Sequence, residues 1–426
     1  MEYPKVLVIS NNSFSKTSSN GRTLGNLFIG WPKDRIAQFC VSTTTPDYEV
    51  CDNYYSVSDN EALRAFLHFR KARPCDIKSL SNSEGKTTIG NRRVYKTTLK
   101  EFVRELVWGC KRWDSEQWQK WVEDFSPEVV VVFNSDSSFI LSMATDVATR
   151  YRIPIVLYNT EGYYFFKCSF YTKDGWLDRL VYPLYHGLYC RRFRKMMRFT
   201  KESIHLNDKL CDDYKGEFGG NQSVLYSSST VNYTPLVKIP SPPAFTYIGN
   251  LGFKRYEPLV TLANVLNSID ANYKLQVYGN IPNVEAEIAI KTCGSIVYGG
   301  FLSYDEVQKV IANSTILFHV ENQDPSLEQS LIYGFSTKIA DSITSGRPFL
   351  MYSANSIAGA QYLLRNGIGW VADNVETLKR SVLQILTDDK NRQEVLNKAH
   401  IIAENNHNNQ VNKERFASAI MRSLQR

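Results

Sequence analysis

Two short apolar runs, EVVVVF at residues 128–133 and IPIVLY at residues 153–158, constrain the fold of this chain more than any other feature. Neither run alternates apolar with polar residues, so each predicts a strand that is buried on both faces of a parallel sheet. Polar residues follow directly, NSD at 134–136 and NTE at 159–161. Because parallel strands place their carboxyl ends at one edge of the sheet, we expect both polar tails to face a ligand crevice.

The same strand pattern recurs along the chain. KVLVIS at residues 5–10 predicts a first strand, and a polar loop leads from it to a helix that starts near Thr23. After residue 244 further apolar runs alternate with helical patterns. Strands are expected at 245–249, 274–278, 316–320 and 348–352, and helices at 257–269, 303–313 and 338–344. Strands that alternate with helices predict a doubly wound parallel sheet.

The chain of 426 residues is too long for one hydrophobic core, so two domains are expected. A polar stretch with four prolines, at residues 227–243, marks a linker. We therefore predict an α/β fold of two doubly wound, Rossmann-like domains that face each other across a cleft. Residues 1–238 form the first domain, which the C-terminal helix 411–426 completes, and residues 239–410 form the second.

The chain carries 50 Lys and Arg against 43 Asp and Glu, a net charge of +7. A surplus of this size suggests an anionic partner, such as a nucleotide diphosphate or an acidic membrane surface, and does not require nucleic acid. No apolar run reaches the length of a membrane span, and the opening MEYPKVLVIS lacks the pattern of a signal peptide. The expected location is therefore the cytoplasm.

Residues 188–201 form a dense cationic segment, in which six Lys and Arg alternate with apolar residues such as Leu188 and Phe193. As a helix, this pattern is typical of a segment that lies on an anionic membrane, which predicts peripheral contact with the inner membrane face. A solvated charged helix is an equal alternative. Nucleic-acid binding is disfavoured because no recognised module accompanies the cations.

A first candidate site is YIGNLGFKRYEP at residues 247–258. A strand ends at Gly249 and a short loop follows through Asn250. Lys254 and Arg255 then precede a helix. Such a loop lets backbone N–H groups approach an anion, and an arginine can hold two phosphate oxygens at once. The motif therefore predicts a diphosphate site, and its alternative is a pair of solvated cations.

A second candidate site is YGFSTKIADSITSGRP at residues 333–348. Ser336 and Thr337 stand where a helix begins, and one of the two hydroxyls is explained as an N-cap. Lys338 in the first turn is not explained by capping, and with the helix N-terminus it predicts a diphosphate site. Asp341 lies one turn further on the same face, where its carboxylate can accept hydrogen bonds from ribose hydroxyls.

A third candidate site is FHVE at residues 318–321, at the end of an expected strand. His319 and Glu321 occupy alternate positions, so their side chains point to the same side of the strand. A histidine in such a place is commonly a satisfied structural residue. The expected position at the crevice favours instead a catalytic role for both side chains.

These stretches resemble the C-terminal domain of family-4 glycosyltransferases of the GT-B fold, in particular bacterial capsule, lipopolysaccharide and exopolysaccharide enzymes. The resemblance covers residues 244–405, and the N-terminal half is similar only in layout. That family grips its nucleotide-sugar with a cation of the glycine loop and with the motif EGFGxxxxEAMACG, which reads YGFSTKIADSITSG here. The resemblance implies that Lys254 or Arg255 neutralises the diphosphate and that Asp341 holds the ribose.

The chain departs from the family at three positions of this site. The shorter Asp341 stands where the motif has its second glutamate. Tyr333 replaces the first glutamate of the motif, which contacts the sugar in family members, and Asn250 replaces the arginine of the glycine loop. In the first domain, the resemblance implies that Gly21 belongs to a glycine loop beside the cleft. It also implies that Glu161 stands near the place of the catalytic-site histidine of many relatives.

The resemblance implies a retaining glycosyltransferase that moves a sugar from a UDP- or GDP-sugar to a lipid-linked saccharide acceptor in cell-surface polysaccharide synthesis. This scheme requires no metal or other cofactor, since the second domain has no D-x-D pair of acidic residues. One alternative is a nucleotide-sugar epimerase. Another is a sugar-binding or scaffold subunit with little catalytic activity, an option that Tyr333 leaves open.

Overall fold

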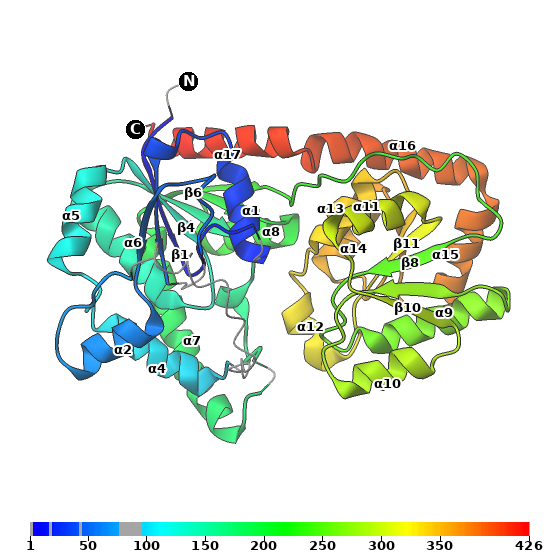
Figure 1. Ribbon diagram of the computed structural model, residues 1–426, viewed down its shortest axis with the longest axis horizontal. Helices are drawn as coiled ribbons and strands as arrows, with labels where there is room; N and C mark the ends of the chain where they lie inside the picture. Colours follow the sequence, from blue (N-terminus) through cyan, green and yellow to red (C-terminus); the bar gives the residue numbers. More distant parts are fainter. Residues whose placement is uncertain (1–2, 17–18, 42–44, 76–95, 172, 426) are drawn as a thin grey trace. The chain divides into compact units, whose positions relative to one another are not determined.

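The structure, a computed structural model, describes residues 3–16, 19–41, 45–75, 96–171 and 173–425, and for residues 19 and 20 it describes the backbone alone. The chain forms two compact units. Unit 1 comprises Met1–Leu206, Leu210–Leu225 and Lys413–Arg426, and unit 2 comprises Asn207–Lys209 and Tyr226–Asn412. Each unit is a parallel sheet covered by helices, which confirms the predicted doubly wound α/β class (Figure 1).

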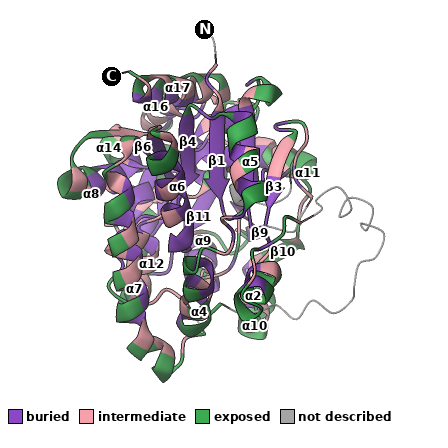
Figure 2. Cartoon of the chain, turned by 90° about the vertical axis from the view of Figure 1, so that its left-hand side faces the viewer, coloured by how far each residue is buried: buried purple, intermediate pink, exposed green. Residues whose placement is uncertain are grey.

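The sheet of unit 1 has seven strands in the order β3-β2-β1-β4-β5-β6-β7. Their bounds are β1 Val6–Ser10, β2 Ile36–Cys40, β3 Asn53–Ser56, β4 Val129–Phe133, β5 Ile155–Asn159, β6 Thr200–His205 and β7 Asn221–Val224. Every neighbouring pair is parallel. The central strands β1, β4 and β5 are buried along their whole length, as strands covered on both faces must be (Figure 2).

The helices of unit 1 cover both faces of this sheet. Their bounds are α1 Ser19–Phe28, α2 Asp59–Leu67, α4 Thr98–Gly109, α5 Glu116–Phe125, α6 Ser138–Tyr151, α7 Trp176–Met197, α8 Asp208–Phe218 and α17 Asn409–Ser423, with short 3-10 turns at Lys33–Arg35 and Tyr163–Phe165. Val6 and Val8 of β1 share one buried cluster with Phe28 of α1 and Phe416 of α17. The core of unit 1 therefore needs residues that are far apart in the sequence.

Unit 2 has six parallel strands in the order β10-β9-β8-β11-β12-β13. Their bounds are β8 Phe245–Ile248, β9 Leu275–Tyr278, β10 Ile296–Gly300, β11 Ile316–Val320, β12 Phe349–Tyr352 and β13 Trp370–Ala372. The chain runs outward from β8 on one side and from β11 on the other, so the order reverses between these two strands. Ligands of open parallel sheets bind at the carboxyl ends of the strands at such a switch point.

Several helices of unit 2 begin at residues suited to capping. The bounds of the helices of this unit are α9 Tyr256–Ile269, α10 Val284–Thr292, α11 Tyr304–Asn313, α12 Pro325–Leu331, α13 Thr337–Thr344, α14 Ala358–Asn366, α15 Val375–Thr387 and α16 Asp389–Asn406. Ser303 accepts a hydrogen bond from the backbone N–H of Glu306 at the start of α11, and Ser336 accepts one from Lys338 at the start of α13.

The elements expected in unit 2 match the structure to within one residue at each end. In unit 1, the helix expected near Thr23 begins earlier, at Ser19. Gly21 therefore lies in the first turn of α1 and not in a loop, because Ser, Asn and Gly are well tolerated where a helix starts. No helix in the described part of the chain is long and apolar enough to cross a bilayer.

The contribution of α17 to unit 1 can be tested at Phe416, which is fully buried with its ring 5.2 Å from that of Phe28 and 6.2 Å from that of Tyr158. We expect Phe416→Ala to lower the free energy of unfolding by about 3–5 kcal/mol, because apolar contacts are lost and a cavity remains. Urea unfolding followed by circular dichroism measures this change. Ser418→Ala, exposed on the same helix, is the control. Equal losses in both variants would contradict the core position of Phe416.

Candidate functional site

The loop that follows β8 stands at the switch point of unit 2 and packs tightly against the end of β9. The N–H of Gly249 donates a hydrogen bond of 2.9 Å to the carbonyl of Tyr278. A Cβ on Gly279 would lie 1.8 Å from the carbonyl oxygen of Gly249, and the φ of Gly279 is +146°. Position 279 therefore requires glycine, since two backbones approach there too closely for a side chain.

Two non-glycine residues of this loop, Phe253 and Lys254, have left-handed φ values of +53° and +54°. Such residues cost about 1–3 kcal/mol each and persist where the surroundings hold them, often at functional sites. Here Asn322 Nδ2 donates to the carbonyl of Lys254 at 3.2 Å and to the carboxylate of Glu257 at 2.8 Å. The loop is thus held in a shape that leaves the side chain of Lys254 exposed.

Arg255 is turned inward, toward the end of β11. Its guanidinium donates to Glu321 through Nε at 2.8 Å and through Nη2 at 2.7 Å, and its side chain is 14% exposed. His319 Nε2 lies 3.0 Å from Oε1 of the same carboxylate. Burial alone would raise the pKa of Glu321, but its hydrogen bond to His319 and the charges of both partners outweigh burial and hold the pKa below its usual value. Glu321 is therefore a buried anion between two partners.

This network brings together Arg255, His319 and Glu321, three of the residues expected at the site. It also limits what they can do. Two N–H groups of the Arg255 guanidinium already donate to Glu321, so only its other N–H groups can bind a ligand anion. Glu321 has both carboxylate oxygens occupied and a lowered pKa, which makes it unsuited to taking up a proton near neutral pH. The exposed cation of the loop is Lys254 and not Arg255.

The N-terminus of α13 carries the second group of expected residues. The hydroxyl of Ser336 accepts from the Lys338 N–H at 3.2 Å, and Ile339 donates to the Ser336 carbonyl. The first amides of a helix have no partner within it, so the N–H of Thr337 is left for an outside acceptor. Lys338 Nζ lies 3.3 Å from the carboxylate of Asp341, which also accepts from the hydroxyl of Ser229 at 2.9 Å. A helix N-terminus, a half-buried lysine and an oriented carboxylate thus meet within one turn.

The segment before α13 is fixed by its backbone. A Cβ on Gly334 would lie 2.8 Å from the carbonyl oxygen of Leu331, so a side chain there would displace the chain. Tyr333 is buried, its carbonyl accepts from Asn207 Nδ2 at 3.0 Å, and the ammonium of Lys209 lies 5.7 Å from its ring centre. Tyr333 therefore serves as a packed aromatic residue where related motifs have a glutamate. Helix α13 itself packs against β11, the strand that carries His319.

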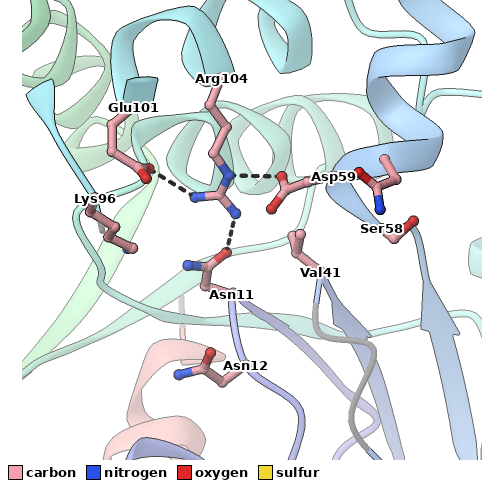
Figure 3. Close-up of a pocket in the computed structure, with 9 residues that line it drawn as sticks. Asn11, Asn12, Val41, Ser58, Asp59, Lys96, Glu101 and Arg104 are labelled. Atoms are coloured by element: carbon pink, nitrogen blue, oxygen red, sulfur yellow. Dashed lines mark hydrogen bonds and ion pairs between the residues drawn. The ribbon is translucent and has the colours of Figure 1, made fainter. Parts of the chain in front are cut away.

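Unit 1 has a polar recess of about 470 Å³ at the carboxyl ends of β1, β2 and β3, beside α4 (Figure 3). It is lined by Asn11, Asn12, Val41, Ser58, Asp59, Asn60, Lys96, Glu101 and Arg104. Arg104 lies at its centre and donates to Asp59 at 2.7 Å, to Glu101 at 3.2 Å and to Asn11 at 2.9 Å. The recess offers amide, hydroxyl and carboxylate groups, which suit the hydroxyls of a sugar.

The residues that line this recess were not identified from the sequence as candidate site residues. A signal was present in α4, where Glu101, Arg104 and Trp108 repeat at helical spacing on one face. Trp108 is buried, so the two charged residues share the covered face of the helix. Charges on a covered face have to be paired, and they therefore point to a polar network rather than to solvent.

Contrary to the prediction from the sequence, the polar residues that follow β4 and β5 do not all lie at a crevice. Asn134 and Asn159 were expected at a crevice, but both are buried and joined to each other by a 2.8 Å hydrogen bond. Tyr189 donates to Asn134 at 2.8 Å, and Asn159 lies 3.3 Å from His205 Nδ1. Buried amides must find partners inside the protein, which is why these two turn inward. Asp136 accepts from Lys96 beside the recess at 2.7 Å.

Glu161, just beyond β5, forms no hydrogen bond or ion pair with another described residue. Burial raises the pKa of its carboxyl to about 7. An acid with this pKa exchanges a proton near neutral pH, which is the property of a general acid or base. Among the residues expected at the site, Glu161 is therefore suited to proton transfer and Glu321 is not.

The cationic segment at 188–201 lies in the second half of α7 and extends into β6. The expectation that it has an apolar face for a membrane is wrong on one point, because Tyr189, Phe193 and Met196 are buried in unit 1. Arg192 is also turned inward and pairs with Glu105. The exposed surface of this segment is therefore mainly cationic. Contact with a membrane stays a prediction.

In the described part of the chain, no three His, Cys, Asp or Glu side chains gather as a metal site would require.

Comparison with known proteins identifies the fold. No protein-family model matches the chain, and no curated protein sequence matches it. Sucrose-phosphate synthase of Thermosynechococcus elongatus is 10% identical with a TM-score of 0.61, over 99% of this chain and 98% of that chain. HepE of Anabaena in complex with UDP is 11% identical with a TM-score of 0.58, over 98% and 99%. A glycosyltransferase of Rickettsia africae is 10% identical with a TM-score of 0.53, over 100% and 99%.

These likenesses extend over whole chains, and at identities this low they show the fold alone. The chain has the GT-B fold, in which two Rossmann-like α/β units follow one another in a single chain.

The raised pKa of Glu161 has a consequence for stability. Between its ordinary pKa of 4.5 and its value of about 7, the folded chain holds a proton that the unfolded chain has released. The free energy of unfolding therefore falls as pH rises through this window. Glu161→Gln removes this loss. Since one pKa unit corresponds to about 1.4 kcal/mol, we expect the variant to gain at most about 3 kcal/mol relative to wild type above pH 7 and little below pH 4.5.

Urea unfolding of both proteins across this pH range measures the difference. Glu123→Gln, an exposed carboxylate on α5, is the control and should show no such dependence. A constant difference between Glu161→Gln and wild type at every pH would contradict the raised pKa.

Proposed function

We propose that this chain is a glycosyltransferase that takes a sugar from a nucleoside-diphosphate sugar, UDP-linked in the first instance, and passes it to a hydroxyl of a saccharide acceptor. Unit 2 binds the donor and unit 1 binds the acceptor. The N-terminus of α13 is the observation that carries the proposal, because three groups with the chemistry of a nucleotide diphosphate site meet there.

At this helix end, the amide of Thr337 and the ammonium of Lys338 supply donors for the diphosphate oxygens. Asp341 is held by Lys338 and by the Ser229 hydroxyl, so one carboxylate is already oriented for the ribose hydroxyls. The negative charge on the diphosphate grows as the sugar leaves. Groups fixed in place before the reaction stabilise that charge without reorganising, which is the largest single contribution to many such reactions.

The β8 loop supplies the second set of contacts in this proposal. Lys254 is exposed on a loop with a strained backbone, and it provides a mobile cation for the diphosphate. Arg255 contributes chiefly by keeping Glu321 charged and in place. His319 and Glu321 then form a fixed, buried polar pair at the switch point.

The base and the acceptor are proposed from two further observations. HepE, which shares this fold, has been solved with UDP, with UDP and glucose, and with UDP-glucose, which supports a UDP-sugar as the first donor to examine and GDP-sugars as the second. The recess of unit 1 is lined by amides and carboxylates that suit a saccharide. The resemblance to polysaccharide enzymes supports a lipid-linked acceptor, cell-surface polysaccharide as the product and a cytoplasmic location.

In the proposed reaction, the bond between the anomeric carbon and the diphosphate oxygen breaks and the acceptor oxygen bonds to that carbon. The acceptor hydroxyl loses its proton, and the nucleoside diphosphate leaves. The resemblance favours retention of configuration without a metal, with a leaving phosphate oxygen as the acceptor of that proton. In unit 1, Glu161 is the carboxyl whose pKa suits proton exchange at neutral pH.

Lys338→Met tests the donor site, because it removes one charge from a half-buried side chain of similar length. We expect about a 100-fold lower kcat/KM with the donor, as when one preorganised donor to a developing anion is lost. Asp341→Asn should weaken UDP binding by about tenfold, since a charged hydrogen bond becomes a neutral one. Initial rates with a panel of UDP- and GDP-sugars and calorimetric binding of UDP measure the two effects.

Lys309→Met, exposed on α11 of the same unit, is the matched control and should leave both values unchanged. Arg255→Ala is less informative, because it would leave Glu321 buried without its partner and destabilise the unit. If Lys338→Met turned over its donor like wild type, α13 would not be the diphosphate site. If the wild-type chain bound UDP-sugars and transferred none in the presence of saccharide acceptors, a binding or scaffold subunit would replace the transferase.

A further inference from the structure

The first half of α7 exposes large apolar side chains on its outer surface. Trp176 is 70% exposed, Leu180 67% and Leu184 65%, with Leu177 beside them at 48%. Isolated exposed leucines are ordinary, but four large apolar residues at a spacing of three or four on one helix are not. The helix does not need these residues for its own packing, because Tyr182, Tyr185 and Tyr189 supply its buried face.

The same outer face of α7 becomes cationic in its second half. An α-helix turns by about 100° per residue, so residues 176, 180, 184, 191, 195 and 198 all lie within an arc of about 100°. Arg191, Lys195 and Arg198 are exposed. In the described part of the chain none of these three has an ion-pair partner. One continuous face of the helix is therefore apolar at its start and positively charged at its end.

Helix α4, which lies beside α7, adds a second apolar row (Figure 1). Leu99 is 41% exposed, Val103 50% and Leu106 51%, again at helical spacing. The starts of the two helices are joined by the N–H of Leu99, which donates to Asp178 of α7 at 2.8 Å. The apolar rows thus sit on two helices that pack together and are joined at their starts, and the exposed outer surface of α7 is visible in Figure 2.

The charge of this surface is strongly one-sided. Residues 173–198 contain seven Lys and Arg and two carboxylates, Asp174 and Asp178. Both carboxylates are occupied at the starts of the helices: Asp174 accepts from the N–H of Thr98 at 2.9 Å, and Asp178 accepts from the N–H groups of Leu99 and Gly175. Neither carboxylate neutralises the cations at the far end of α7.

We propose that the outer faces of α7 and α4 dock this protein onto the surface of an anionic lipid bilayer. Trp176 and the leucines enter the boundary between headgroups and acyl chains, where an indole ring is especially stable. Arg191, Lys195 and Arg198 meet the lipid phosphates, with Arg179 beside the apolar row. The docking surface therefore begins earlier in the chain than the cationic segment 188–201, at Trp176.

Two other occupants fit this surface less well. In a two-fold pairing with a second copy of the chain, the cationic half of α7 would be repeated on both sides of the interface with no acidic surface opposite. A nucleic acid would satisfy the cations but would leave the apolar rows in water. A bilayer with acidic headgroups satisfies both halves of the surface at once. This inference does not rest on the proposed transferase activity, because binding to lipid is measured without substrate.

Sedimentation with lipid vesicles tests the proposal. The full chain is mixed with vesicles of phosphatidylcholine alone or of phosphatidylcholine and phosphatidylglycerol in a three-to-one ratio. We expect binding to the anionic vesicles and at least tenfold weaker binding to the neutral ones. Vesicles with brominated acyl chains should quench part of the tryptophan fluorescence, and Trp176→Phe should remove that part.

Two sets of substitutions separate the apolar and the charged contributions. The first combines Trp176→Ser, Leu180→Ser and Leu184→Ser, and its matched control on unit 2 combines the exposed Val284→Ser, Ile288→Ser and Phe301→Ser. The second combines Arg191→Gln, Lys195→Gln and Arg198→Gln, and its control combines the exposed Lys379→Gln, Lys390→Gln and Lys398→Gln. All these side chains are exposed, so folding should be retained.

Each α7 set should weaken binding to anionic vesicles at least tenfold, and each control set should leave it unchanged. The serine set should retain a weak binding that added salt removes, since its cations remain. Wild-type protein that stays in the supernatant with anionic vesicles would overturn the proposal, as would equal losses in the control sets. It would also be overturned if the wild type formed a dimer that the serine set abolished while vesicles bound neither protein.

Discussion

Every pair of neighbouring strands in both sheets is parallel, and a parallel sheet is stable only when helices cover both of its faces. That constraint explains why the strands are continuous apolar runs and why a helix separates most of them from the next. It also decides where chemistry can occur. All strands of one sheet end at the same edge, so residues that follow different strands meet there. Arg255 and Glu321 are 66 positions apart in the sequence and become a buried ion pair for this reason.

The ion pair of Arg255 and Glu321 has a structural role in the candidate donor site, so the binding of an anion depends on other cations. A buried arginine and a buried carboxylate cancel each other's charge, and a neighbouring histidine adds a third partner to the carboxylate. The network is therefore well suited to fixing the conformation of the β8 loop. It is poorly suited to binding a diphosphate without other cations. The cations of the candidate site that solvent can reach are instead Lys254, which is exposed, and Lys338, which is half-buried beside Asp341. Unit 1 has its own polar network around Arg104, which pairs with Asp59 beyond β3 and reaches Asn11 at the end of β1.

Much of the fold could be predicted from the sequence because its signals are local. ILFHV at Ile316–Val320 and VVVVF at Val129–Phe133 are strands by composition alone, and Ser336 before a helical pattern predicts the start of α13. The side-chain partners could not be predicted, since Arg255 with Glu321 and Arg104 with Asp59 depend on how distant elements pack. The exposed apolar face of α7 could not be predicted for another reason. Its buried face is aromatic and the first half of its outer face is also apolar, so no helical period separates the two.

The contribution of Lys413–Arg426 to unit 1 has a consequence during synthesis of the chain. Phe416 fills the cluster that Val6 and Phe28 begin, so a residue made late completes a core whose first residues were made long before. Unit 2 is nearly continuous in the sequence, from Tyr226 to Asn412, and every strand of its sheet has been made before Phe416 leaves the ribosome. On a growing chain unit 2 can therefore fold first, while the core of unit 1 stays incomplete until α17 has been made.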